Sequence, residues 1–96
     1  MNLEIITPER KIFSGEAEAV QFPGLDGSFQ VLNDHAPIIS SLAEGEVKVD
    51  LTSSFEKTEK TDELLSVDTS NNKVIRVKIK GGVVEMQNNK VIVLAE

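Results

Sequence analysis

Strict alternation of apolar and polar residues recurs along this chain and constrains its fold more than any other feature of the sequence. From Ile75 to Lys80 every second residue is apolar with cationic residues between, and Glu46–Leu51 alternates in the same way with charged residues of both signs. Side chains two positions apart lie on the same face of a β-strand, so each run predicts a strand with one buried side. Glu16–Phe22 alternates likewise, whereas Val91–Leu94 is apolar throughout. We expect this last run to be a central strand covered on both faces.

Turn-forming residues separate these runs at intervals of about 8 to 12 residues. They include Pro23–Gly27, Gly81–Gly82 and two Asn-Asn pairs, Asn71–Asn72 and Asn88–Asn89. Because asparagine tolerates positive φ, we interpret both Asn-Asn pairs as hairpin turns. We interpret the paired glycines as a tight turn or bulge between two strands.

The spacing of strands and turns predicts one all-β domain, a sandwich or barrel, over residues 1–96. The alternation also predicts which side chains are buried. The expected core residues are Val20, Phe22, Val31, Val77, Ile79, Ile92 and Leu94.

One polar excursion, over about residues 52–72, interrupts the rhythm. Its first part, Thr52–Glu63, has Phe55 as its one apolar residue. No apolar stripe is present that would hold a helix against the core. We therefore expect either a long polar hairpin or a mobile loop with little surface to bury. Such a segment should be replaceable by a short turn, because loop closure entropy changes slowly with length.

Net charge and residue usage exclude several classes of function. Sixteen acidic residues against ten basic ones give a net charge of −6, which repels phosphate backbones, so no nucleic acid partner is expected. The chain has no cysteine and one histidine, which removes disulfides, thiolate metal sites and multi-histidine metal sites. We expect neither a metal nor a cofactor.

Three local patterns suggest chemistry, and each lacks an essential part. Asp34 and His35 are adjacent, so the carboxylate is poorly placed to orient the imidazole ring, and no serine lies in a Gly-x-Ser-x-Gly elbow. The stretch from Asp68 is similar to a calcium loop but lacks its glycine at the sixth position and its carboxylate at the twelfth. Gly24–Gly27 is glycine-rich, but no lysine-bearing phosphate loop follows. We expect no catalytic residue and no enzymatic activity.

No run of the sequence is long enough to span a membrane. The longest uninterrupted apolar run is Val91–Ala95, against about 20 residues for a spanning helix. Met1–Glu4 has no basic region and no long apolar region follows it, so no secretory signal is indicated. We expect a soluble, cytoplasmic chain that reaches a membrane only through a partner.

Four longer motifs carry a family resemblance. The first joins Thr7–Gly15 to Ala19–Gly24, and the second is Asp26–Ile39, which contains His-Ala-Pro-Ile-Ile. The third is Gly45–Val49, and the fourth is Lys80–Ala95, which begins Lys-Gly-Gly-Val-Val-Glu. In this order, and over most of the chain, they resemble the epsilon subunit of F-type ATP synthase. The mitochondrial counterpart of that subunit, called delta, shares the pattern.

The resemblance implies a β-sandwich of about ten strands in two packed sheets. It also implies a non-catalytic subunit in the central stalk of the rotor, which docks on the gamma subunit and on the ring of c subunits. Such a subunit couples proton or sodium translocation to ATP synthesis. It would lie at the cytoplasmic face of the inner (plasma) membrane, as a peripheral part of the complex.

Two contact sites follow from the resemblance, position by position. The residues that match the family's c-ring contact are Asp26, Gly27 and Ser28. The residues that match its gamma contact are His35, Ala36, Pro37 and Ile38. We expect an apolar patch over part of one sheet and the 35–39 loop, because a stalk subunit must dock on gamma.

The sequence departs from the family pattern within these sites. Asn33-Asp34 replaces Pro-Gly before the histidine, so that turn is expected to differ in shape. Gln30 replaces a glycine, and Ser28 stands where some relatives carry an acid, so the c-ring contact is expected to be neutral there.

Many members of the family continue after Val-Leu-Ala into a helical hairpin that inhibits ATP hydrolysis and in some species binds ATP. Because the sequence stops at Glu96, we expect these 96 residues neither to bind ATP nor to latch the rotor. The alternative interpretation of the sequence is a stand-alone β-sandwich protein-binding module without catalytic activity.

Overall fold

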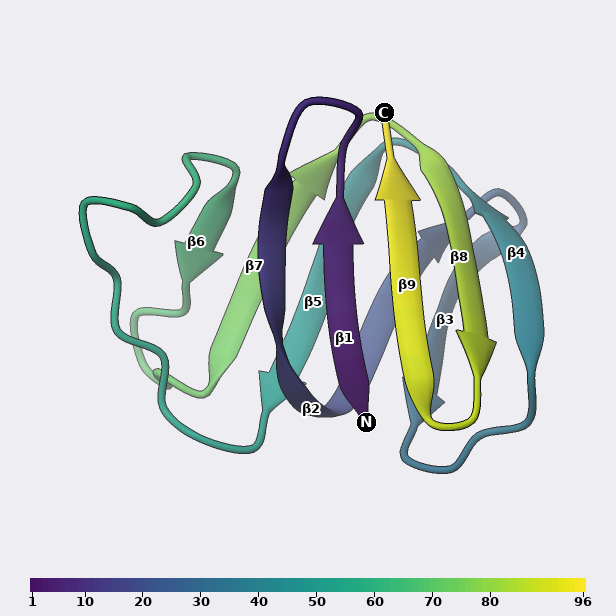
Figure 1. The fold of residues 1–96 in the computed structure, drawn as a ribbon, viewed down its shortest axis with the longest axis horizontal. Coiled ribbons are helices and arrows are strands. Elements are labelled where there is room, and N and C mark those ends of the chain that lie inside the picture. Colours follow the sequence, from purple (N-terminus) through teal and green to yellow (C-terminus); the bar gives the residue numbers. More distant parts are fainter.

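Nine β-strands in two packed layers make up the chain, in a computed structural model that describes residues 1–96 (Figure 1). The first sheet contains β1 (Asn2–Ile6), β9 (Lys90–Ala95), β8 (Gly82–Gln87), β4 (Ile38–Leu42) and the first half of β2 (Lys11–Gly24). The second sheet contains the second half of β2 with β3 (Gly27–Leu32), β5 (Gly45–Leu51), β7 (Val74–Ile79) and β6 (Leu65–Val67). The prediction of an all-β sandwich is therefore confirmed, with nine strands rather than ten. No helix capable of crossing a membrane occurs in this structure.

The long strand β2 joins the two sheets. Its first half pairs with β1, and its second half pairs with β3 on one side and β5 on the other. The register with β5 shifts between Ala17 and Ala19, so a bulge lies where the strand passes from one sheet to the other. For this reason Ala19 and Val20 are both buried, although they are consecutive and simple alternation would bury only one of them.

The two Asn-Asn pairs form different turns. Asn88 and Asn89 have φ values of 54° and 60° and close the hairpin between β8 and β9, as predicted. Asn71 and Asn72 also lie in a turn between two antiparallel strands, β6 and β7, but neither has positive φ, so the prediction is right in position and wrong in the type of turn. Side chains shape the β6–β7 connection instead, because the Asp68 carboxylate accepts hydrogen bonds from the backbone and the hydroxyl of the residue two positions on.

Gly81 and Gly82 connect β7 of the second sheet to β8 of the first sheet, so they mark a crossover between layers. Both have positive φ, 142° and 146°. A Cβ atom on Gly82 would lie 2.2 Å from the carbonyl oxygen of Leu94. Only glycine fits at this close approach of two backbones.

The core lies between the sheets, and most of the predicted core residues are in it. The confirmed ones are Val20, Phe22, Val31, Val77 and Ile79. The prediction is wrong for Ile92, which is half-buried, and for Leu94, which is 57% exposed.

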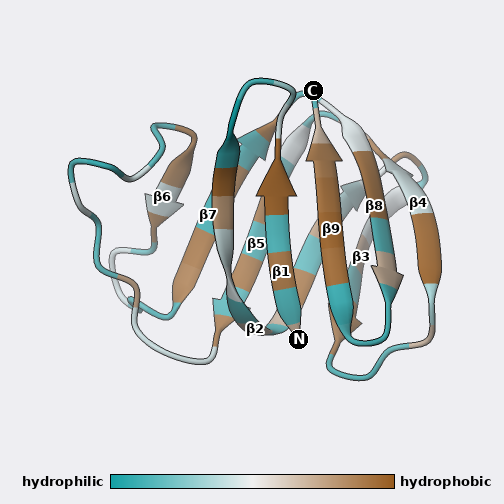
Figure 2. Cartoon of the chain, in the orientation of Figure 1, coloured by the Kyte–Doolittle hydropathy of each residue, from teal (hydrophilic) through white to brown (hydrophobic).

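The error concerns how many faces of β9 are covered. Val91 and Val93 are buried, and the alternate residues of the strand face outward. β9 is central in its sheet, with β1 and β8 on its two sides, but only its inner face meets the other layer. Figure 2 shows the strand brown along most of its length, because its outward residues are apolar as well.

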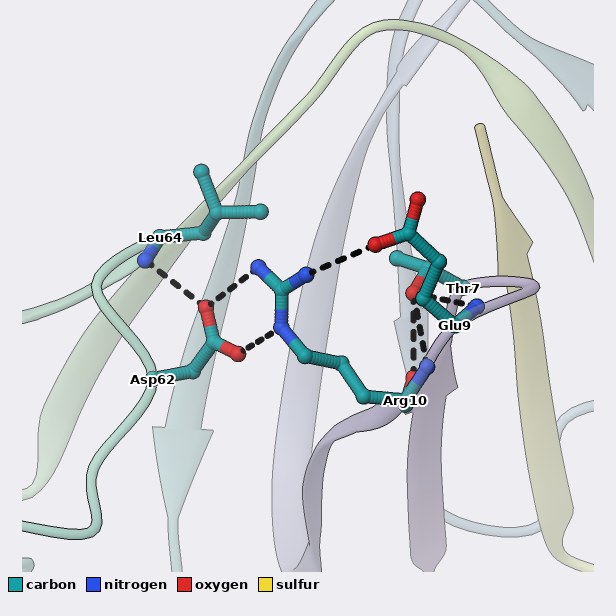
Figure 3. A network of polar contacts seen from close by, with 5 residues as sticks. All are labelled: Thr7, Glu9, Arg10, Asp62 and Leu64. Carbon is teal, nitrogen blue, oxygen red and sulfur yellow. Dashed lines mark hydrogen bonds and ion pairs between the residues drawn. The ribbon is translucent and has the colours of Figure 1, made fainter.

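The polar excursion lies at one side of the sandwich (Figure 1). Residues 52–64 contain no strand, and β6 follows them and pairs with β7. The ring of Phe55 packs against Phe13 of β2, with a centroid distance of 6.2 Å. The Asp62 carboxylate accepts hydrogen bonds from the Arg10 guanidinium (Figure 3). The expectation that this segment has little to bury is therefore wrong at Phe55.

Candidate docking surfaces

Three exposed apolar side chains lie on neighbouring strands of the first sheet, and we call them the apolar face. Ile39 of β4 is 74% exposed, Val83 of β8 is 39% exposed and Leu94 of β9 is 57% exposed. Val83 and Leu94 are direct cross-strand partners, and Val83 also pairs with Ser41, two residues after Ile39. Cross-strand partners on one face have Cβ atoms about 4.5–5.5 Å apart, so Val83 and Leu94 are in contact range. Ile39 is a diagonal neighbour of Val83, at about 7–8 Å, with Glu85 directly opposite it. Ile6 of β1 extends the apolar face beyond Leu94.

The first sheet also carries a charged cluster on its outer face, where Glu4 pairs with Lys11 and Lys90, whereas the outer face of the second sheet is polar across its central strands. Gln21, Lys48 and Arg76 are aligned across β2, β5 and β7, and together they form a polar row. Arg76 Nη1 lies 2.8 Å from Asp68 Oδ1, and this hydrogen bond, followed by those from Ser70, holds the pKa of Asp68 well below its usual range. Leu32 of β3, 55% exposed, is the large apolar residue on this side. The two layers therefore differ in what their outer faces offer a partner.

Unpaired acids border the apolar face. Glu85 is the cross-strand partner of Ile39, and Asp26 lies at the tip of the β2–β3 hairpin, next to a hollow that Ile39 also lines. Neither carboxylate takes part in an ion pair. The border of the apolar face is therefore suited to a partner with basic side chains.

The candidate c-ring residues form the tip of the β2–β3 hairpin. Gly24 and Gly27 are paired, and Leu25 and Asp26 make the two-residue turn between them. Gly27 has a φ of 119°, and Leu25 is 66% exposed. Ser28 is exposed beside them and lines a hollow of about 550 Å³ between this tip and β4. The hairpin thus presents Asp26, Gly27 and Ser28 to solvent as one group.

The candidate gamma residues lie on the loop between β3 and β4. His35, Ala36 and Pro37 are exposed, and the His35 ring makes one hydrogen bond, between Nδ1 and the carbonyl oxygen of Ala36 at 2.7 Å. No carboxylate orients this ring. Asp34 has a φ of 61°, a conformation that the glycine of the family motif adopts without strain. Its N–H donates to Asn89 Oδ1 at 2.9 Å, which ties the loop to the β8–β9 hairpin.

Ile38 differs from the rest of its group, because it is half-buried and packs against the core. The next residue, Ile39, points outward and is the most exposed large apolar residue of the chain. The gamma contact taken from the family motif ends at Ile38. The expected apolar patch includes Ile39, but Val83 is not among the predicted residues and Leu94 is predicted to lie in the core. Consecutive apolar residues at Ile38-Ile39, Val83-Val84 and Val91–Leu94 are the signal that could have placed these residues on the outer face. If only one face of each strand is covered by the domain, alternate residues of these runs must be exposed.

The two candidate contacts lie at opposite ends of β3. The strand runs from Gly27 at the hairpin tip to Leu32 at the start of the loop, and six residues of strand span about 20 Å. One side of the molecule can therefore meet two different partners at the same time.

Comparison with known proteins agrees with this architecture. The sequence profile of the family described as "ATP synthase, Delta/Epsilon chain, beta-sandwich domain" matches residues 1–61. The ATP synthase epsilon chain of Chlorobium limicola is 35% identical over 94 residues, which are 98% of this chain and 86% of the relative. That of Salinibacter ruber is 38% identical over 96 residues, all of this chain and 58% of the relative.

A solved structure has the same fold. It is described as a cryo-EM structure of the Tetrahymena thermophila mitochondrial ATP synthase, central stalk and c ring, and one of its chains aligns with a TM-score of 0.67 at 16% identity. The alignment covers 99% of this chain and 62% of that one. The matching profile, the identity to the epsilon chains and the sandwich itself lead to one conclusion: the chain belongs to the delta/epsilon chain family of ATP synthase.

Proposed function

We propose that this chain is a non-catalytic subunit of the central stalk of an F-type ATP synthase. It docks on the gamma subunit with the apolar face and the 35–38 loop, and on the c ring with the tip of the β2–β3 hairpin. By linking the two it couples proton or sodium translocation to ATP synthesis. It acts at the cytoplasmic face of the membrane, as a peripheral part of the complex.

The observation that carries the gamma contact is the asymmetry between the two outer faces. Ile39, Val83 and Leu94 expose apolar surface on adjacent strands of the first sheet, whereas the second sheet presents Lys48 and Arg76. Contiguous exposed apolar surface on a small domain is usually a contact site, because leaving it in water is unfavourable. A rotor subunit needs such a permanent contact with the shaft that carries it.

Support for the c-ring contact comes from the shape and charge of the hairpin tip. Asp26 is exposed and unpaired, and Leu25 beside it is 66% exposed. A projecting tip with one acid and one apolar side chain can bind between the polar loops of neighbouring c subunits. Because Ser28 is neutral, Asp26 supplies the charge of this contact.

Reconstitution tests the assembled role. Membrane vesicles of the source organism, depleted of this subunit, should regain ATP synthesis driven by an ion gradient when the purified chain is added. An Asp26→Lys variant should bind gamma as well as the unmodified chain does but restore synthesis less well, because its tip charge is reversed. Lys57→Glu, which reverses an exposed charge on the polar excursion, is the matched control and should restore synthesis normally.

The alternative, a stand-alone binding module, makes a different prediction. In that case the chain would neither copurify with gamma nor restore synthesis in the depleted vesicles. Restored synthesis with full tolerance of Asp26→Lys would keep the stalk role and remove the hairpin tip from it.

A further inference from the structure

The sandwich has two lateral sides, and the chain covers only one of them. On one side Phe55 and Asp62 of the polar excursion reach over the free edge of the first half of β2. On the other side, β4 is the edge of the first sheet and β3 the edge of the second (Figure 1). There the layers are joined only at one end, where Gly24 pairs with Leu42 and the Ala43 N–H donates to the Pro23 carbonyl at 2.7 Å.

The backbone of β4 has an unused edge beyond this junction. In the β8–β9 hairpin the two-residue turn makes Gln87 and Lys90 a hydrogen-bonded pair, so Val84 and Met86 of β8 direct their backbone groups toward β4. Their partners on β4 are Ser40 and Ile38. The alternate residues of β4 therefore direct their N–H and C=O groups away from β8.

Those alternate residues are Ile39 and Ser41. Ala43 is two residues beyond Ser41, so its backbone groups should point to the same side as those of Ser41. Its N–H does point away from β8, because it donates to β2. Neither Ile39 nor Ser41 has a backbone hydrogen bond to a turn or loop elsewhere in the chain. Backbone groups along such an edge are a template for another strand.

The surroundings of this edge are apolar in the centre and acidic at the border. Ile39 lies directly on the edge, and the hollow of about 550 Å³ beside it is also lined by Phe29. Glu85 and Asp26 are the unpaired acids near it. Pairing of β4 with β4 of a second copy would bring these carboxylates together, whereas a segment with basic side chains would neutralise them.

We propose that an extended segment of the gamma subunit, with an apolar residue flanked by basic ones, adds to β4 as a further strand of the first sheet. This inference rests on the proposed docking of gamma and names how that docking is made. The free groups of Ile39 and Ser41 supply the backbone hydrogen bonds, and the side chain of Ile39 contacts the apolar residue of the segment. The added strand continues the apolar face and closes the open side of the sandwich.

Amide hydrogen exchange tests the inference on the unmodified chain. In the free chain the amides of Ile39 and Ser41 should exchange rapidly, while the amide of Ser40, bonded to β8, is protected. In the complex with purified gamma subunit, Ile39 and Ser41 should become protected, while Gln30 on the edge of β3 should not. Binding of gamma with Ile39 and Ser41 still exchanging rapidly would overturn the strand addition and leave the proposed function standing. No binding of gamma would overturn both.

A pair of variants at one position separates backbone from side chain. Ser41→Pro removes an N–H that β8 does not use, and proline is tolerated at such an edge. It should weaken gamma binding by about fivefold or more, the loss expected for one hydrogen bond, while Ser41→Ala leaves binding unchanged. Equal binding by both variants would contradict the inference. Protection of Ile39 and Ser41 in a dimer of the free chain would also contradict it, by assigning the edge to a second copy.

Discussion

Arg10 and Asp62, which are 52 positions apart in the sequence, form a two-point ion pair that holds the polar excursion against β2 (Figure 3). The guanidinium Nε donates to Asp62 Oδ2, and Nη2 donates to Oδ1 at 3.2 Å. The backbone N–H of Leu64 donates to the same Oδ1 at 3.0 Å, and the Asp62 side chain is only 10% exposed. A planar guanidinium suits this two-point geometry, which lysine could not reproduce.

This contact gives the domain a specific acid sensitivity. The hydrogen bond from Arg10, and after it the one from the Leu64 N–H, holds the pKa of Asp62 below its usual range, and Arg76 does the same for the pKa of Asp68. A lowered folded-state pKa contributes stability that is complete above the unfolded pKa of about 3.9 and is lost as the pH falls through the folded pKa. The free energy of unfolding should therefore decrease below about pH 4.

Chemical denaturation at a series of pH values measures this dependence. In an Asp62→Asn, Asp68→Asn double variant, the slope of the unfolding free energy below about pH 4 should be smaller than in the unmodified chain. A Glu56→Gln, Glu59→Gln double variant removes the same number of charges from two exposed carboxylates without ion pairs, and so controls for the change in net charge. An unchanged slope in the double variant would show that the two ion pairs do not form in solution.

The aromatic contact of the excursion should contribute to stability as well. Phe55→Ala removes a half-buried ring from Phe13 and should lower the free energy of unfolding by about 1–3 kcal/mol. Lys60→Ala, in the exposed part of the same segment, should change it by less than about 0.5 kcal/mol. Thermal or urea unfolding of both variants measures this difference. Equal stability of the two would show that the segment does not stabilise the domain and can be replaced by a short turn.

Truncating a side chain in the core should lower the stability of the domain much more than truncating one on the outer face of a sheet. Ile79→Ala leaves a cavity in the core and should lower the unfolding free energy by about 2–5 kcal/mol. Leu94→Ala removes a side chain that is 57% exposed and should change it by less than about 0.5 kcal/mol. If Leu94→Ala were as damaging as Ile79→Ala in urea titrations, the outer face of β9 would have to be covered within the domain.

Gly82 should be the least replaceable glycine. Gly82→Ala combines a strained φ of 146° with a Cβ atom 2.2 Å from the Leu94 carbonyl oxygen. Gly27→Ala has a φ of 119° but open space around the new Cβ atom, so it should lose only the conformational strain of about 1–3 kcal/mol. Melting temperatures should fall much further for Gly82→Ala, and the reverse order would contradict the close approach of the β7–β8 crossover to β9.

The sequence predicts the fold well in strands where apolar and polar residues alternate strictly, so that only one face is apolar. Ile75–Ile79 and Val47–Leu51 are strands with the expected buried residues, since each strand faces the core on one side only. The prediction of burial fails at β9. The sequence of a strand does not show whether its apolar outer face is covered by the same chain or left for a partner. Prediction also fails for the conformation of Asn71–Asn72, where the Asn71 side chain accepts a hydrogen bond from the Lys73 N–H and neither asparagine has positive φ.

The position of the candidate docking surface follows from the sequence only in outline. The motifs placed a contact near residues 35–38, but the direction of each side chain depends on the pairing of β4 with β8. That pairing joins segments about half the chain apart, so no local pattern shows that Ile38 faces the core and Ile39 faces solvent. The contact of Arg10 with Asp62 was likewise invisible, because it depends on where the excursion returns to β2.

The central claim is that gamma binds the outer face of the first sheet, and matched charge substitutions on the two outer faces test it most directly. Leu94→Asp places a carboxylate on the apolar face, and Leu32→Asp places one at a residue of nearly equal exposure on the second sheet. Both variants should stay folded, which circular dichroism can verify. The dissociation constant for purified gamma, measured by titration calorimetry, should rise at least tenfold for Leu94→Asp and stay within twofold for Leu32→Asp. The reason is that gamma covers position 94 and removes its new carboxylate from water, whereas position 32 stays in solvent. Equal affinities, or a larger loss for Leu32→Asp, would contradict the account.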